Sequence, residues 1–288
     1  MNESAIEAAP IKKPRQPNPV YEQLTRRRKW PSVRVAVMLC IALSVAGAIG
    51  VSIGWRPHAP GVPAPGLSST SYPAVATTIL SLITVIIAPF FCAALTAVTV
   101  SRFADDEAFT MLKLTNVSPR TIIRGLLMAA LFRLRLVWAI CFGLLIPLVA
   151  AWTIIAIEIQ QVFAQIDGGV APPITRADIL SALGGAAQIV LIGAAVGIIL
   201  NWLAICIGIW VGLRWHKPST ALTISQVGVL ISIVVLLLIV GGWTYINVRL
   251  LINVDTFLPL RVLIVLLAFV YPFGGVALLN SARSRLWQ

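Results

Sequence analysis

Side chains that could perform catalysis or bind a metal are few in this 288-residue chain, and they lie far apart in the sequence. The two histidines, His58 and His216, both fall in polar connecting segments, and Glu158 stands alone at the margin of an apolar stretch. No two cysteines have the CxxC spacing of a disulfide or metal framework, so we expect neither. The thiols suit close packing inside helices; they are Cys40, Cys92, Cys141 and Cys206.

Motifs for nucleotide hydrolysis, proteolysis and haem binding are absent from the sequence. There is no GxxxxGK[ST] segment, which excludes nucleotide binding by a P-loop. There is no HExxH motif and no buried Ser/His or paired-Asp arrangement of a hydrolase. No apolar stretch carries a histidine to ligate haem. We expect a chain that is not an enzyme, with no catalytic residue, metal or cofactor of its own.

Long apolar stretches dominate the chain. Hydrophobic residues make up 59% of it and charged residues 11%, whereas soluble domains are roughly half apolar and a quarter charged. A helix of about 20 apolar residues crosses a bilayer and satisfies its own backbone hydrogen bonds there. We predict an all-α polytopic membrane protein with six transmembrane helices, over residues 33–54, 73–100, 136–157, 185–213, 222–246 and 257–279.

The polar remainder leaves no room for a soluble domain. Residues 1–17 are polar and contain three prolines, which predicts a disordered cytoplasmic tail. Residues 18–288 then form a single transmembrane domain. Within it, Thr175–Asp178 (TRAD) has the spacing of a capping box that opens the helix of the fourth span.

Lysine and arginine fall mostly on one side of the predicted bundle. With the N-terminus in the cytoplasm, 18 of the 22 basic residues lie inside, and four lie outside. This asymmetry predicts a multi-pass protein of the cell membrane with both termini cytoplasmic. It also favours contact with anionic lipid over a nucleic-acid groove, so we expect no nucleic-acid partner. The four outside are Arg56, Arg176, Arg249 and Arg261.

Residues 18–29 (NPVYEQLTRRRK) precede the first span. Val20 and Leu24 can share one helical face, and a basic run follows them. This pattern predicts a short amphipathic helix on the inner membrane surface, held by anionic lipid. An unstructured basic flank that only sets topology fits the sequence equally well.

Small and polar residues within the apolar stretches indicate helix packing. Three glycine pairs have GxxxG spacing: Gly50 with Gly54, Gly193 with Gly197, and Gly208 with Gly212. Prolines are expected to kink their spans, at Pro89, Pro147 and Pro272. Amide side chains favour interhelical hydrogen bonds over a translocation pathway, at Gln188, Asn201 and Gln226.

Residues 101–124 (SRFADDEAFTMLKLTNVSPRTIIR) form a charged island between the second and third apolar stretches. Three acids, Asp105 to Glu107, suit the positive end of a helix, and apolar residues follow them at helical spacing. Ser118 and Pro119 then provide a second helix start as N-cap and first residue. The island therefore predicts a short amphipathic helix, a turn and a second helix on the cytoplasmic side.

The second predicted helix is too long to lie wholly in the bilayer. From Pro119 to Ile157 it would measure roughly 58 Å, and the apolar core is about 30 Å thick. We expect its first part to project into the cytoplasm or to lie along the membrane interface, with Arg133 and Arg135 extending to the headgroups. Such a rigid cytoplasmic bend is a natural docking surface for another protein.

The charged island resembles the region between the second and third helices of type-two ABC exporter permeases. In this comparison Asp105 and Glu107 match the pair of acids in the family's pattern, and Thr110 matches the threonine that follows that pair. Leu112 and Leu114 match the leucines of the helix that follows. Thr115, Val117 and Ser118 match the turn after that helix, and Arg120 and Gly125 match the basic residue and the glycine that follow the turn. Asn116 departs from the proline of that turn, and Leu126 from a lysine. The start Asn18-Pro19-Val20 is similar to the elbow helix of the same family.

The resemblance implies a permease subunit that dimerises with itself or a homologue and recruits a separate ABC ATPase, which binds ATP and Mg²⁺. It implies an elbow helix at Asn18, Pro19, Val20 and Leu24. A non-transporting scaffold or assembly subunit is the alternative, and an ion-coupled carrier a third. The implied ATPase-coupling residues are Phe103, Asp105, Asp106, Glu107, Thr110, Met111, Leu112, Leu114, Thr115, Ser118, Pro119 and Arg120.

Overall fold

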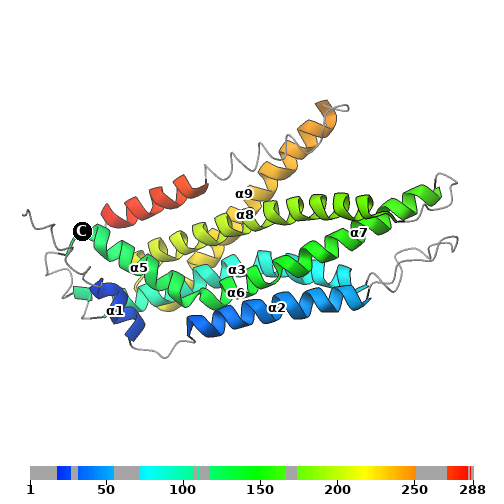
Figure 1. Ribbon diagram of the computed structural model, residues 1–288. Helices are drawn as coiled ribbons and strands as arrows, with labels where there is room; N and C mark the ends of the chain where they lie inside the picture. The colour runs from blue at the N-terminus through cyan, green and yellow to red at the C-terminus, as the bar shows by residue number, and fades with distance from the viewer. Residues whose placement is uncertain are drawn as a thin grey trace, which may run out of the picture.

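The computed structural model describes residues 18–26, 32–54, 72–106, 109–110, 117–166, 174–250, 271–284 and 286. These residues are almost wholly helical, and none of them is in a strand (Figure 1). Residues 271–284 are helical as well. The helices are α1 (Pro19–Arg26), α2 (Val33–Gly54), α3 (Tyr72–Ala104), α5 (Pro119–Arg133), α6 (Arg135–Gly143), α7 (Leu145–Ile166), α8 (Arg176–Arg214) and α9 (Pro218–Leu250).

Five helical stretches of the described residues are long and apolar enough to cross a membrane. They match the first five predicted spans, and the described residues confirm the predicted all-helical fold. The sixth predicted span, 257–279, lies largely outside the described residues, so the count of six stays a prediction. The five stretches are Val33–Ile53, Tyr72–Ala104, Arg135–Phe163, Arg176–Arg214 and Pro218–Ile239.

The spans run lengthwise beside one another, with α3 at the centre (Figure 1). α3 packs most extensively against α8, and it also contacts α9, α7 and α2. Two glycines of α8 explain this close approach: a Cβ on Gly208 would lie 2.8 Å from the carbonyl oxygen of Ala93, and one on Gly212 would lie 2.7 Å from Val100 Cβ. This predicted GxxxG pair therefore forms a helix contact. Gly50 and Gly193, from the other pairs, have no such neighbour within 4 Å.

The helix that we expected to run without interruption from Pro119 to Ile157 is divided. Single-residue breaks at Leu134 and Leu144 separate α5, α6 and α7, and helical structure continues to Ile166. The break at Leu144 has a clear cause, because Pro147 has no N–H to donate to the carbonyl of Gly143. The helix is thus interrupted next to this proline, where we predicted a kink.

A second helix compensates for this break. The Ser44 hydroxyl of α2 donates to the carbonyl oxygen of Gly143 at 3.0 Å, in a buried position. A Cβ on Gly47 would lie 2.5 Å from Pro147 Cγ, so glycine is required for α2 to approach the proline ring. α2 is therefore fixed against the broken part of the third span.

Polar side chains inside the bundle join neighbouring helices, as predicted for Asn201 and Gln226. The Cys92 thiol of α3 donates to Asn201 Oδ1 of α8 at 3.3 Å. Gln226 Nε2 of α9 donates to the carbonyl oxygen of Phe90 at 3.1 Å. Glu158 of α7, which we expected at the margin of the third span, is only 9% exposed.

The first turn of α8 confirms the predicted capping box. The Asp178 N–H donates to Thr175 Oγ1 at 3.3 Å, and the Thr175 N–H donates to Asp178 Oδ2 at 2.9 Å. Both donors belong to the group of N–H groups that a helix start leaves without intrahelical partners. The helix start is therefore encoded locally, in four residues.

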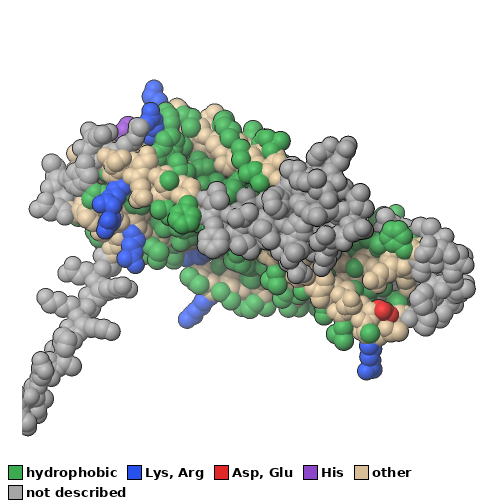
Figure 2. Space-filling model, turned by 90° about the horizontal axis from the view of Figure 1, so that it is seen from above, with side chains coloured by type: hydrophobic (Ala, Val, Ile, Leu, Met, Phe, Trp, Pro, Cys, Tyr) green, Lys and Arg blue, Asp and Glu red, His purple; other side chains and the backbone are tan. Residues whose placement is uncertain are grey.

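Basic side chains gather at one end of the bundle, where α3 and α8 end and α5 and α9 begin (Figure 2). The opposite end carries Arg176 together with Asp178 at the start of α8. This arrangement accords with the predicted charge asymmetry, while the side of the membrane remains a prediction. Exposed cations at the basic end include Arg102, Arg120, Arg124, Arg214 and Lys217.

Candidate functional site

The connection between α3 and α5 begins with a tight turn at the basic end of the bundle. The Asp105 N–H donates to the Ser101 carbonyl at 3.1 Å, and the Asp106 N–H donates to the Phe103 carbonyl at 3.2 Å. The Phe109 N–H then donates to the Asp106 carbonyl at 2.9 Å. These bonds follow the end of α3, and Asp105 is exposed.

Two aromatic rings anchor this turn to the core. Phe103 is 4% exposed and Phe109 is 5% exposed. Their ring centroids are 5.3 Å apart in an edge-to-face arrangement, which aromatic pairs favour. Phe103, predicted as a partner-contacting residue, is therefore a core residue here, and Phe109 is its partner that the sequence pattern did not reveal. Thr110, in contrast, is exposed.

The predicted amphipathic helix that would follow this turn lies mostly outside the described residues. Its expected role in binding an ATPase is therefore untested at those positions. The predicted site residues concerned are Glu107, Met111, Leu112, Leu114 and Thr115.

The connection ends at a capped helix start, as predicted. Ser118 is the N-cap of α5, its Oγ accepts from the Thr121 N–H at 3.3 Å, and Pro119 opens the helix. Arg120 and Arg124 are exposed on the first turns of α5. The described parts of the connection thus present an acidic group before the undescribed stretch and basic groups after it.

α1 forms over Pro19–Arg26 within the segment predicted as a short amphipathic helix. Its buried residues, Val20 and Leu24, pack against the protein core. Asn18 Nδ2 donates to the Thr121 carbonyl of α5 at 2.8 Å, and Asn18 Oδ1 accepts from the Val20 N–H at 3.1 Å. The predicted contact of α1 with a membrane surface remains a prediction.

Gly125 of α5 makes this docking possible. A Cβ there would lie 2.7 Å from Asn18 Oδ1 and 2.8 Å from Val20 Cβ. Every other residue would therefore push the first turn of α1 away from α5. The Asn-Pro-Val start and Gly125 are 105 or more residues apart in sequence, yet they form one contact.

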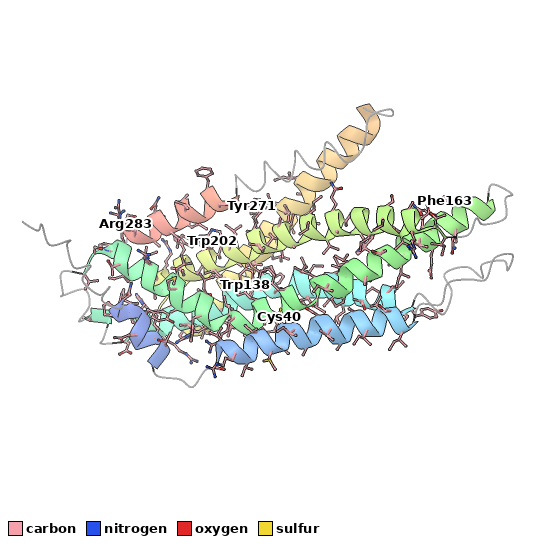
Figure 3. All side chains as sticks on the ribbon, in the orientation of Figure 1. Cys40, Trp138, Phe163, Trp202, Tyr271 and Arg283 are labelled. Atoms are coloured by element: carbon pink, nitrogen blue, oxygen red, sulfur yellow. The ribbon has the colours of Figure 1, made fainter. Side chains whose placement is uncertain are left out.

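Arg133 joins three helices near this site, whereas we expected it to extend to the headgroups. Its guanidinium donates to the Leu24 carbonyl of α1 at 2.7 Å and to Thr99 Oγ1 of α3 at 2.6 Å. A cation at the C-terminal end of α1 also complements the helix dipole. Figure 3 draws the side chains of these helices and labels Trp138 of α6, which follows Arg133 in the chain.

The neighbouring aromatic residues reinforce the same contact. The rings of Tyr21 in α1 and Phe132 in α5 are 6.0 Å apart in an edge-to-face arrangement. The Arg135 guanidinium lies 3.9 Å from the centroid of the Phe132 ring, which is a cation–π geometry. Arg133 and Phe132 therefore hold α1 at the beginning of the third span, and Arg135 packs on the ring of Phe132.

Comparison of the chain with family models, curated proteins and solved structures found no match. Any function must therefore be argued from the residues and contacts of the chain itself.

Proposed function

We propose that this chain is the permease subunit of an ATP-driven ABC exporter, coupled to a separate ATPase subunit. The observation that carries the proposal is the connection between α3 and α5. It leaves α3 through a turn anchored by Phe103 and Phe109 and enters α5 through the Ser118 cap. A short polar connection that is fixed at both ends, between two membrane helices, suits the docking of another protein.

The docking of α1 on α5 supports a role in coupling. Asn18 binds the first turn of α5 directly after the connection, and Arg133 links α1 to α3. A force applied to the connection would reach both flanking spans and α1 together. Helices that share contacts in this way can move together as a rigid body between two arrangements.

The proposal assigns ATP and Mg²⁺ to the partner ATPase and expects two permease subunits in each complex. The basic end faces the cytoplasm and anionic lipid, and both termini lie on that side. Substrate leaves through rearrangement of the spans when the ATPase closes.

Charge reversal in the connection tests this function. Asp105→Lys or Glu107→Lys is expected to remove the ATPase from affinity-purified complexes while the chain still inserts into the membrane. Deletion of residues 105–115 should have the same effect. Arg176→Glu, at the opposite end of the bundle, is the control and should retain the ATPase.

Retention of the ATPase by every connection variant would overturn the coupling role. Purification of a partner that lacks a P-loop would instead favour a scaffold or assembly subunit. That partner should then be lost from the same connection variants, since it would use the same surface.

A further inference from the structure

A cavity of about 280 Å³ lies inside the apolar part of the bundle, between α3, α6, α7 and α8. It forms because three neighbouring residues of α8 contribute almost no side-chain volume: Gly193, Ala194 and Gly197. A Cβ on Gly193 would meet nothing within 4 Å. The helices therefore leave unfilled space here, in contrast to the tight contact of Gly208 with α3.

The cavity reaches the lipid-facing surface of the bundle. Three of its lining residues are well exposed: Leu82 of α3 at 59%, Phe142 of α6 at 42% and Ile198 of α8 at 43%. A transmembrane helix, with a diameter of about 10 Å, is too wide to enter such a space. Water is disfavoured by apolar walls. A slim hydrocarbon from the bilayer satisfies both limits.

One hydroxyl in the cavity wall lacks a hydrogen-bond partner. Thr77, Thr78 and Thr84 of α3 each donate to the carbonyl four residues earlier in their own helix. Ser81, between them and lining the cavity, is 4% exposed, and its Oγ has no partner. A serine hydroxyl changes direction by a single rotation about Cα–Cβ, so Ser81 can serve a molecule in the cavity.

The Trp138 indole adds a second polar group to the wall. Its Nε1 also has no hydrogen-bond partner, and the residue lines the same cavity from α6. Both Ser81 and Trp138 can donate a hydrogen bond, and an indole can do nothing else. Two residues that line an otherwise apolar cavity therefore each carry a buried donor without a hydrogen-bond partner.

We propose that this cavity binds a membrane-soluble molecule with a slim hydrocarbon body and one oxygen acceptor, which accepts a hydrogen bond from Ser81. Neither the cavity nor Ser81 belongs to the connection between α3 and α5. A test that contradicts this binding site would therefore leave the proposed ATPase partner unaffected, and the reverse also holds.

Photolabelling in vesicles of phosphatidylcholine and phosphatidylglycerol tests the site. The probes are a long-chain ketone that carries a diazirine and the diazirine alkane of the same length. The ketone is expected to label peptides of α6 and α8 that line the cavity about fivefold more than the alkane does, which corresponds to about 1 kcal/mol. Equal labelling by the two probes would contradict the role of an oxygen acceptor.

Two variants and their controls locate the binding. Gly193→Leu fills the open space and should abolish cavity labelling by both probes. Gly185→Leu, also on α8 with nothing within 4 Å and outside the cavity lining, should leave it unchanged. Ser81→Ala should reduce the ketone to the level of the alkane, and Thr84→Val should not. Undiminished labelling of Gly193→Leu would overturn the site.

Discussion

Pro147 leaves the carbonyl oxygen of Gly143 without an intrahelical partner, and the Ser44 hydroxyl of α2 occupies its place. Unsatisfied carbonyls are expensive where no water reaches. One hydroxyl therefore allows the third span to break at Leu144 without losing a hydrogen bond. It also fixes the position of α2 beside the break.

A double-mutant cycle measures this arrangement. Ser44→Ala should lower the free energy of unfolding. In a Pro147→Ala background the loss should be smaller, because the N–H restored at position 147 can donate to the Gly143 carbonyl. We expect a coupling free energy of about 0.6–1.7 kcal/mol, from thermal unfolding in detergent. Ser52→Ala is the control, because Ser52 bonds within its own helix at 2.7 Å. Strict additivity would show that Ser44 does not serve this carbonyl.

A substitution of Gly125 tests the docking of α1 on α5. Gly125→Ala places a methyl group 2.7 Å from Asn18 Oδ1, so α1 must shift on α5. The expected destabilisation is about 1–3 kcal/mol, measured by the same unfolding assay. Gly185→Ala, with open space at its Cβ, should have the opposite sign because alanine favours a helix. Equal effects of the two variants would contradict the docking of Asn18 at Gly125.

At the scale of the elements, α1 is held at both of its ends. Asn18 binds α5 at the start of α1, and Arg133 binds the Leu24 carbonyl near its end. Because Arg133 also binds Thr99 of α3, α1 cannot move independently of the two helices that flank the connection. α1 is thus fixed to α5 and, through Arg133, to α3.

Arg133→Met tests whether Arg133 holds α1 in place. Loss of two hydrogen bonds from a charged donor should speed amide hydrogen exchange in α1 by about tenfold or more, while the core of α8 stays protected. Arg124→Met, an exposed change on the same helix, should leave α1 unchanged. Unaltered exchange of α1 in Arg133→Met would show that packing of Val20 and Leu24 alone holds the helix.

Periodic and local signals predicted much of these elements from sequence. The first span, the Thr175 capping box and the Ser118 helix start follow from residues close in the chain, and all three agree with the structure. The role of Arg133 did not follow, since a basic residue near a span also suits a headgroup. Its partners, Leu24 and Thr99, become neighbours only after the helices pack.

The candidate site shows the same limit. The sequence identified Ser118 as a cap residue because its signal is local, whereas it placed Asp105 at the start of a helix that lies mostly outside the described residues. It did not distinguish Phe103 as a buried anchor, because its partner Phe109 and the core beneath it depend on packing around the turn. Likewise, Gly125 entered the prediction through a resemblance, while its contact with Asn18 appeared only in the fold.

The whole molecule is polarised, with exposed cations concentrated at the end that carries the connection (Figure 2). This end is expected to face the cytoplasm. A cysteine replacing Arg176 should react with a membrane-impermeant maleimide on intact cells, and one replacing Lys217 only after permeabilisation. The unaltered chain is the control. Labelling in the reverse order would place the connection on the side without ATP.

Purification of the intact chain from its native membrane in mild detergent tests whether it is the permease subunit of an ABC exporter. A separate P-loop ATPase should accompany the chain in equal amount, and Asp105→Lys should remove it. Recovery of the folded chain with no ATPase, or with an ATPase that Asp105→Lys and Glu107→Lys both retain, would show that the chain is not coupled to an ATPase through the connection.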